Sequence, residues 1–98
     1  MKVINARMDT YYASAFEVDT DWPCEVCIDE EMIVLKYDGE HGRLTYRGHS
    51  DGAGHYHLQA DGFQGKGTLH RFPGGRTLEG YWCEEGKRGM WFISFVDD

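Results

Sequence analysis

Apolar and polar residues alternate along most of the chain from residue 23 onward, in short stretches separated by turn residues. A period of two places successive side chains on opposite faces of a β-strand. The pattern therefore predicts strands at 23–28, 32–38, 43–49, 54–60, 64–72, 76–83 and 87–96.

The connections between these strands are short and rich in glycine. All 13 glycines of the chain lie between residues 39 and 89. Pairs such as Asp38-Gly39, Asp51-Gly52 and Asp61-Gly62 supply the backbone conformations that tight turns require. Connections this short leave no room for crossover helices, so we predict an all-β antiparallel meander of about seven strands.

One face of each predicted strand is apolar and is expected to form the core. The side chains predicted to point inward are Val26, Ile28, Ile33, Leu35, Tyr37, Leu44, Tyr46, Tyr56, Leu58, Ala60, Leu78, Trp82, Trp91, Ile93 and Phe95. A flat meander would leave two strand edges open to other chains, so we expect the sheet to curl into a small barrel or half-barrel. Glycines inside the strand patterns permit the bends that closure needs, at Gly65, Gly67, Gly80 and Gly89.

Residues 3–18 fit two patterns. Helical spacing fits Ile4, Met8, Tyr11, Tyr12, Ala15 and Phe16, whereas strand alternation fits Met8, Thr10, Tyr12, Phe16 and Val18. We favour a short helix packed on the sheet, which Pro23 and the polar run before it would end. A single domain then spans residues 1–98, with an N-terminal segment at 1–21 and the β meander at 22–98.

Charge and cysteine content narrow the function classes. Ten Lys and Arg residues against seventeen Asp and Glu give a net charge of −7. This charge repels nucleic acids and anionic membranes, so we expect neither as a partner. No apolar run reaches membrane-spanning length, and three cysteines are too few for a disulfide framework. These features favour a protein of the cytoplasm with reduced thiols.

Two histidines form the most suggestive candidate for metal chemistry. His55 and His57 are two residues apart on a predicted strand, so both imidazoles are expected on one face. A catalytic zinc ion normally takes three protein ligands, and this pair supplies two. The competing interpretation is that both histidines lie on a solvated outer face and bind nothing. We expect no cofactor.

Aromatic residues make up 14% of the chain, and several are predicted to point inward. They line the expected barrel interior and are the candidate ligand-binding residues: Tyr37, Tyr46, Tyr56, Trp82 and Trp91. Small barrels are commonly filled by such side chains, so core packing and a ligand cavity both remain open.

The outer face of the last two strands is more apolar than solvation requires. Tyr81, Met90 and Phe92 alternate with core residues and so are predicted to point outward. This patch predicts a homodimer interface. The alternative is that Tyr12 and Phe16 of the N-terminal segment cover it.

Two stretches resemble known families. The motifs Gly80-Tyr81-Trp82 and Gly89-Met90-Trp91-Phe92-Ile93 resemble the glycine and tryptophan strands of calycins, which implies a lipocalin-like or avidin-like barrel that holds a small ligand. The stretch with Gly65-Lys66-Gly67, Phe72, Gly74 and Gly80-Tyr81-Trp82 is similar to the MORN hairpin repeat, which implies an interaction module.

These features together favour a small non-enzymatic binding or interaction module that takes a protein partner or a small apolar ligand. One alternative is a small metal-dependent or acid/base enzyme that uses His55 and His57. Another is a self-associating structural subunit, which would need no ligand site.

Overall fold

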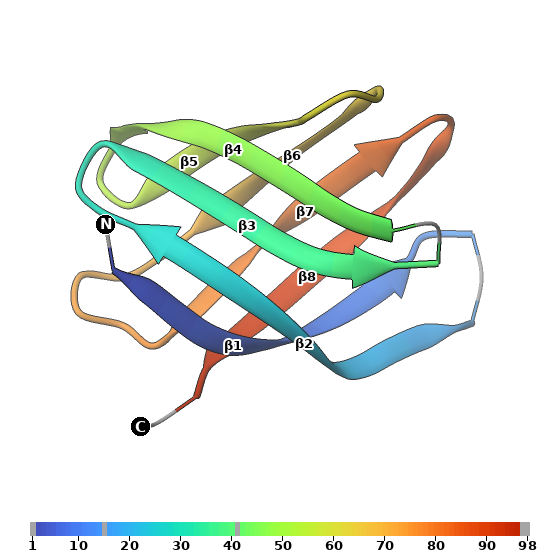
Figure 1. Ribbon diagram of the computed structural model, residues 1–98, viewed down its shortest axis with the longest axis horizontal. Coiled ribbons are helices and arrows are strands. Elements are labelled where there is room, and N and C mark those ends of the chain that lie inside the picture. The colour runs from blue at the N-terminus through green and yellow to red at the C-terminus, as the bar shows by residue number, and fades with distance from the viewer. Residues whose placement is uncertain (1, 15, 41, 97–98) are drawn as a thin grey trace.

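In a computed structural model that describes residues 2–14, 16–40 and 42–96, the chain forms a closed barrel of eight antiparallel strands (Figure 1). The strands are β1 (Val3–Tyr12), β2 (Val18–Ile28), β3 (Met32–Gly39), β4 (Gly42–Gly52), β5 (His55–Ala60), β6 (Gly65–His70), β7 (Thr77–Glu84) and β8 (Lys87–Phe95). Each strand pairs with its neighbours in sequence, as predicted for a meander.

The barrel closes because β1 pairs with β8. Their register runs from Ala6 opposite Phe95 to Tyr12 opposite Gly89. Closure pairs both edges of the meander and removes the open strand edges that would recruit other chains. The prediction of a small all-β barrel is confirmed, in its fully closed form.

The helix predicted within residues 3–18 is wrong, because the described part of this segment contains β1 instead. A helix would leave the facing edges of β2 and β8 unpaired, whereas a strand satisfies both rows of backbone groups. Strand β2 begins at Val18, so the polar run before Pro23 lies inside the sheet, with Pro23 opposite Arg7. The N-terminal segment is therefore part of the barrel wall.

The core follows the inward parity of the strands. Its buried apolar side chains are Ala6, Met8, Cys24, Val26, Ile33, Leu35, Tyr46, Tyr56, Leu58, Leu69, Leu78, Trp82, Trp91 and Ile93. Most of these were predicted from alternation, and Ile28, Tyr37, Ala60 and Phe95 pack against them half-buried. The central barrel is thus filled by side chains, as is usual for eight strands.

Glycine and tryptophan alternate across neighbouring strands near one end of the barrel. Gly80 of β7 lies opposite Trp91 of β8, and Trp82 of β7 lies opposite Gly89 of β8. A Cβ atom on Gly80 would lie 1.6 Å from the carbonyl oxygen of Thr68, and one on Gly89 would lie 1.7 Å from that of Tyr11. Only glycine allows this close approach of strands beside the two indole rings.

The two ends of the barrel differ. At the end near the termini, the Tyr56 hydroxyl donates to the carbonyl oxygen of Asp29 at 2.9 Å. The guanidinium of Arg71 lies 5.2 Å from the centre of the Phe95 ring. These contacts close that end, and the cavity described below lies at the opposite one.

A search of the described residues for helices that are long and apolar enough to cross a membrane finds none.

Candidate functional site

The open end of the barrel holds a cavity of about 400 Å³, which we call the mouth cavity. Strands β1, β2, β3, β4, β7 and β8 all contribute to its wall. Five aromatic side chains line it, and they include all three tryptophans of the chain: Tyr12, Trp22, Tyr37, Trp82 and Trp91. Because these side chains come from five strands, the complete fold is needed to assemble the cavity.

Edge-to-face ring contacts hold the base of the mouth cavity. The rings of Tyr12 and Trp82 lie 5.4 Å apart at 82°, and those of Tyr46 and Trp91 lie 5.0 Å apart at 84°. Tyr46 is fully buried. Such contacts stabilise a fixed ring orientation, so the aromatic rings at the bottom of the cavity are preorganised for a ligand.

Two hydrogen-bond donors of residues that line the mouth cavity have no acceptor among the described residues. The indole N–H of Trp82 is buried and has no hydrogen-bond acceptor within the described chain. The Tyr37 hydroxyl likewise makes no hydrogen bond to any described residue. Buried donors are nearly always paired in folded proteins, so the Trp82 N–H marks a place where an acceptor is missing.

Two carboxylates at the mouth accept hydrogen bonds from tyrosines. Tyr46 donates to Glu84, and Tyr12 donates to Asp19 at 2.8 Å. Burial is the main cause that raises the pKa of Tyr12 to about 12, and the hydrogen bond and charge of Asp19 add to it. Burial is also the main cause that raises the pKa of Tyr37, to which the charge of Glu84 adds, and of Tyr46, to which the hydrogen bond and the charge of Glu84 add. These three tyrosines are therefore neutral hydrogen-bonding groups at physiological pH.

A β-bulge brings Asp19 to the cavity. Met8 lies opposite Trp22, but Thr10 lies opposite Asp19, so β2 carries one extra residue at this point. Asp21 within the bulge has a φ of 57°, and its N–H donates to Asp9 at 2.9 Å. The bulge reverses the parity of β2 and turns Asp19 to the same side as Thr10.

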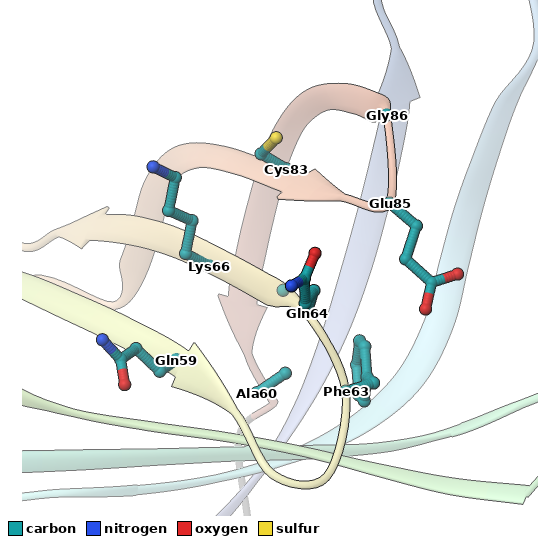
Figure 2. Close-up of a pocket in the computed structure, with 9 residues that line it drawn as sticks. Gln59, Ala60, Phe63, Gln64, Lys66, Cys83, Glu85 and Gly86 are labelled. Atoms are coloured by element: carbon teal, nitrogen blue, oxygen red, sulfur yellow. The ribbon is translucent and has the colours of Figure 1, made fainter.

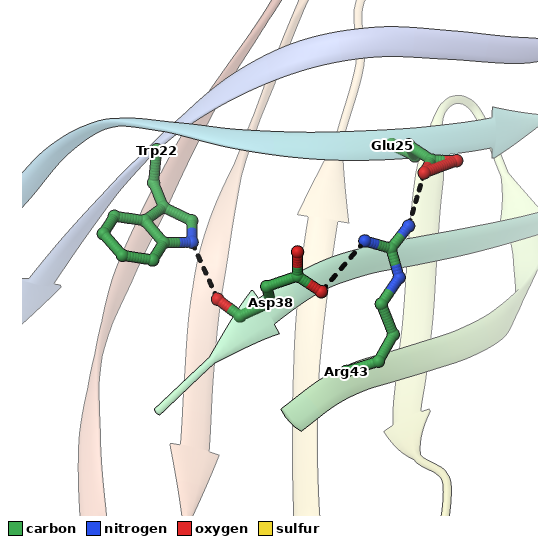
Figure 3. A network of polar contacts seen from close by, with 4 residues as sticks. All are labelled: Trp22, Glu25, Asp38 and Arg43. Atoms are coloured by element: carbon green, nitrogen blue, oxygen red, sulfur yellow. Dashed lines mark hydrogen bonds and ion pairs between the residues drawn. The ribbon is translucent and has the colours of Figure 1, made fainter. Parts of the chain in front are cut away.

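A polar network braces the rim of the mouth (Figure 3). Trp22 donates from Nε1 to the carbonyl oxygen of Asp38 at 2.9 Å. Arg43 of β4 binds the Asp38 carboxylate at 3.1 Å and also the Glu25 carboxylate. The network ties β2, β3 and β4 together, and it fixes the indole of Trp22, which is 46% exposed, at the cavity rim.

A second hollow, of about 440 Å³, lies at the same end between the β5–β6 connection and the β7–β8 turn. Figure 2 shows Phe63 and the Glu85 side chain on one side of it, with Lys66 and Cys83 on the other. The Phe63 ring packs edge-to-face on Tyr46 at 5.8 Å. Phe63 thus supports the base of the mouth cavity from this side.

The five aromatic residues proposed from the sequence lie in three environments. Tyr37, Trp82 and Trp91 line the mouth cavity. Tyr46 lies buried beneath it, and Tyr56 lies at the closed end with its hydroxyl bonded to Asp29. Three of the five inward-facing aromatic residues therefore line a cavity, and the other two are packed in the core.

The two candidate metal ligands have different partners on the outer face. His55 Nδ1 lies 2.7 Å from His70 Nδ1, and His57 Nε2 lies 2.8 Å from an Asp51 carboxylate oxygen. Within the described ranges, no three His, Cys, Asp or Glu residues are grouped to hold a metal ion. The Ser50 hydroxyl accepts from the Gly52 N–H, and the described contacts of His57 include no nucleophile.

The proposed interface residues lie on the outer face of β7 and β8. Tyr81 and Met90 are opposite each other, and the row continues to Tyr11 of β1 and Val18 of β2. We call these four residues the outer row; each is between 42% and 50% exposed. Phe92 lies instead between Asp9 and Glu79.

Tyr12 and Phe16, the residues of the N-terminal segment considered above as a cover for this patch, do not pack over it. Tyr12 points inward to Trp82, and Phe16 is fully exposed. The reason is that β1 pairs edge to edge with β8, so it extends the wall of the barrel and leaves its outer face uncovered.

Sequence reasoning missed Tyr12, Asp19, Trp22 and Glu84 at the mouth. Glu84 could have been found, because it continues the inward parity of Leu78 and Trp82 along β7. Asp19 could not, because the bulge that turns it inward leaves no pattern in the alternation.

Comparison of this chain with protein-family models, with curated proteins and with solved structures finds no match.

Proposed function

We propose that this protein is a cytosolic binding protein that takes a small, mostly apolar organic ligand into the mouth cavity. The observation that carries the proposal is the buried indole N–H of Trp82, which lacks an acceptor in the described chain although Trp82 lines an aromatic cavity. A ligand with an oxygen or nitrogen acceptor would satisfy this donor after a shift of the indole ring, because the nitrogen is closed to solvent in the unliganded protein. Its apolar part would contact the surrounding rings.

The energetics favour such a ligand. A buried donor without a partner costs about 1–3 kcal/mol, and that cost is recovered when an acceptor arrives. The aromatic walls add favourable burial of apolar ligand surface, and their fixed ring contacts keep the ordering cost of binding low. The cavity volume of about 400 Å³ lies in the range usual for small-molecule sites.

The architecture supports the same conclusion. Eight-stranded up-and-down barrels are either filled or hold one small ligand, and this one is filled at its centre and hollow at one end. The glycine and tryptophan motifs of β7 and β8, which resemble those of calycins, form part of that hollow end. Three free cysteines, Cys24, Cys27 and Cys83, favour a reducing compartment.

The alternative of an acid/base enzyme rests on the contact between His57 and Asp51. That pair is exposed on the outer wall, with side-chain exposures of 68% and 52%. An exposed pair lacks the water-excluding surroundings in which catalytic groups are effective. The mouth cavity, by contrast, is partly enclosed by aromatic side chains, so we favour ligand binding there.

The neutral apolar dye N-phenyl-1-naphthylamine tests the proposal. All three tryptophans line the cavity, so a dye bound there should gain emission and quench tryptophan fluorescence. Leu44→Trp narrows the mouth and should weaken dye binding about tenfold or more, because the added ring occupies ligand volume.

Met90→Glu is the matched control, because it changes the outer row instead of the cavity. It should leave dye binding unchanged. Loss of binding in Met90→Glu with retention in Leu44→Trp would assign the dye to the outer wall and contradict the proposal, as would the absence of dye binding.

A further inference from the structure

The mouth cavity is acidic as well as aromatic. Its charged lining residues are four acidic ones, Asp19, Asp38, Glu40 and Glu84, and one basic one, Lys87. Arg43 neutralises Asp38 from outside the cavity. The remaining charge in the lining is therefore negative, in a chain whose net charge is −7.

Glu84 lines the mouth cavity and is bonded to its aromatic base. It shares the inward face of β7 with Trp82, two residues before it, and it accepts a hydrogen bond from the buried Tyr46. Among the described residues, no ion pair includes Glu84. The Tyr46 hydroxyl thus fixes the position of a carboxylate that has no cationic partner in the described part of the chain.

The cavity that Glu84 lines has indole and phenol rings in its wall, and the Tyr46 phenol is bonded to Glu84 directly. The faces of Trp and Tyr rings attract cations, and organic ammonium groups are bound by such rings in many proteins. A carboxylate beside the rings adds a direct charge attraction, which is stronger in a partly buried cavity than in water. The two features select the same ligand chemistry.

We propose that the ligand of the mouth cavity carries an organic ammonium group, which lies against the aromatic side chains with Glu84 as its counter-ion, and an acceptor atom for Trp82. This inference rests on the proposed function, since it names the ligand class of the same site. It also excludes anionic ligands, which the carboxylates would repel.

The ammonium group of Lys87 would compete with such a ligand for the Glu84 carboxylate. It lies opposite Glu84 across the β7–β8 pair and lines the cavity. No ion pair in the described structure joins the two. Its charge at the mouth opposes a second cation, so its removal should strengthen ammonium binding.

The test compares choline with 3,3-dimethylbutan-1-ol, a neutral molecule of nearly the same shape and with the same hydroxyl acceptor. Calorimetry and tryptophan fluorescence measure both affinities. We expect choline to bind about tenfold or more tightly than the alcohol, because only choline carries the positive charge. Added salt should weaken choline binding and leave the alcohol unaffected.

Variants then assign the charge effect to Glu84. Glu84→Gln retains an acceptor for Tyr46 and should remove most of the preference for choline. Glu79→Gln makes the same change on the outer face of the same strand and should leave the preference intact. Lys87→Gln should increase choline affinity severalfold. If Glu84→Gln does not fold, the responses to Lys87→Gln and to salt still decide the question.

The outcomes separate the two proposals. Equal affinities for choline and the alcohol, with dye still bound at the mouth, would overturn the ammonium inference and leave the proposed function standing. A choline preference that is unchanged in Glu84→Gln and in Lys87→Gln would also overturn it. Absence of binding by choline, alcohol and dye alike would overturn both.

Discussion

The hydroxyl of Tyr46 donates its hydrogen to the carboxylate of Glu84, 38 residues away in sequence. The two residues belong to β4 and β7, which are not neighbours in the barrel. This contact crosses the open end and fixes the acidic side of the mouth cavity. It joins a core residue to a residue that is in reach of a ligand.

Tyr46→Phe should destabilise the barrel. The change removes the only donor that the described contacts give Glu84 and leaves a half-buried carboxylate without compensation. We expect a loss of about 1–3 kcal/mol in the free energy of unfolding, measured by denaturant titration. Tyr81→Phe, on the exposed outer face, serves as the control and should change stability little. Equal losses in the two variants would contradict this role for Tyr46.

Gly80→Ala should be far more damaging than an alanine at a turn glycine. A Cβ atom at Gly80 would lie 1.6 Å from the Thr68 carbonyl oxygen, so β6 and β7 would have to separate. We expect at least about 3 kcal/mol of destabilisation, seen as a lower melting temperature or as loss of soluble protein.

Gly86→Ala is the control for that experiment. Gly86 has open space around it, and its φ of 86° is the only obstacle to a side chain. Its replacement should cost about 1 kcal/mol. A mild effect at Gly80 would show that the strands can move apart without loss of the fold.

Alkaline pH should destabilise the protein through its inward tyrosines. Burial raises the pKa of Tyr12 from the ordinary 10.0 to about 12, and it raises the pKa of Tyr37 and Tyr46 as well. A group whose pKa is higher in the folded state gives its full stabilisation below the unfolded pKa. That stabilisation is lost as pH rises from about 10 through the folded value.

Denaturant titrations over this alkaline range, with tyrosinate absorbance recorded in parallel, test the expectation. Tyr12→Phe should show a smaller loss of stability between pH 10 and pH 12, because it removes one of the shifted groups. A free energy of unfolding that stays constant as tyrosinate forms would contradict the assignment.

The outer row predicts self-association with a second copy of the chain. Val18, Tyr11, Met90 and Tyr81 form a continuous apolar strip over four neighbouring strands. Sedimentation equilibrium should detect dimers at micromolar concentration, and Met90→Glu should dissociate them because it places a charge in the strip. Gln59→Glu adds the same charge on the outer face of β5 and should leave the dimers intact. Wild-type protein that remains monomeric at high concentration would contradict self-association through the outer row.

The exposed histidines should contribute little to stability. His55→Ala combined with His57→Ala alters only outer-wall contacts, namely those with His70 and Asp51. We expect a change of about 0.5 kcal/mol or less per site, measured as a small shift in melting temperature. A large fall that zinc reverses in the wild type would favour the metal-site hypothesis instead.

The sequence by itself determined most of the barrel wall. Alternation predicted seven of the strands and the inward face of all but the one at 64–72, because side chains in a strand must point to alternate faces whatever surrounds them. Buried Ile33, Leu35 and Ile93 follow that parity. The glycines in β7 and β8 were predicted to permit the bends that closure needs, and in the structure Gly80 and Gly89 lie where neighbouring backbone leaves no room for a Cβ atom.

The tertiary structure decided the first strand and the site. Residues 3–12 carry both a helical and a strand pattern, and the unpaired edges of β2 and β8 favour the strand. The bulge in β2 turns Asp19 inward, and the contact of Tyr46 with Glu84 exists only once the barrel has closed. Local periodicity carries no information about contacts between distant strands, whereas the mouth cavity depends on the pairing of β1 with β8 and on the contact between β4 and β7.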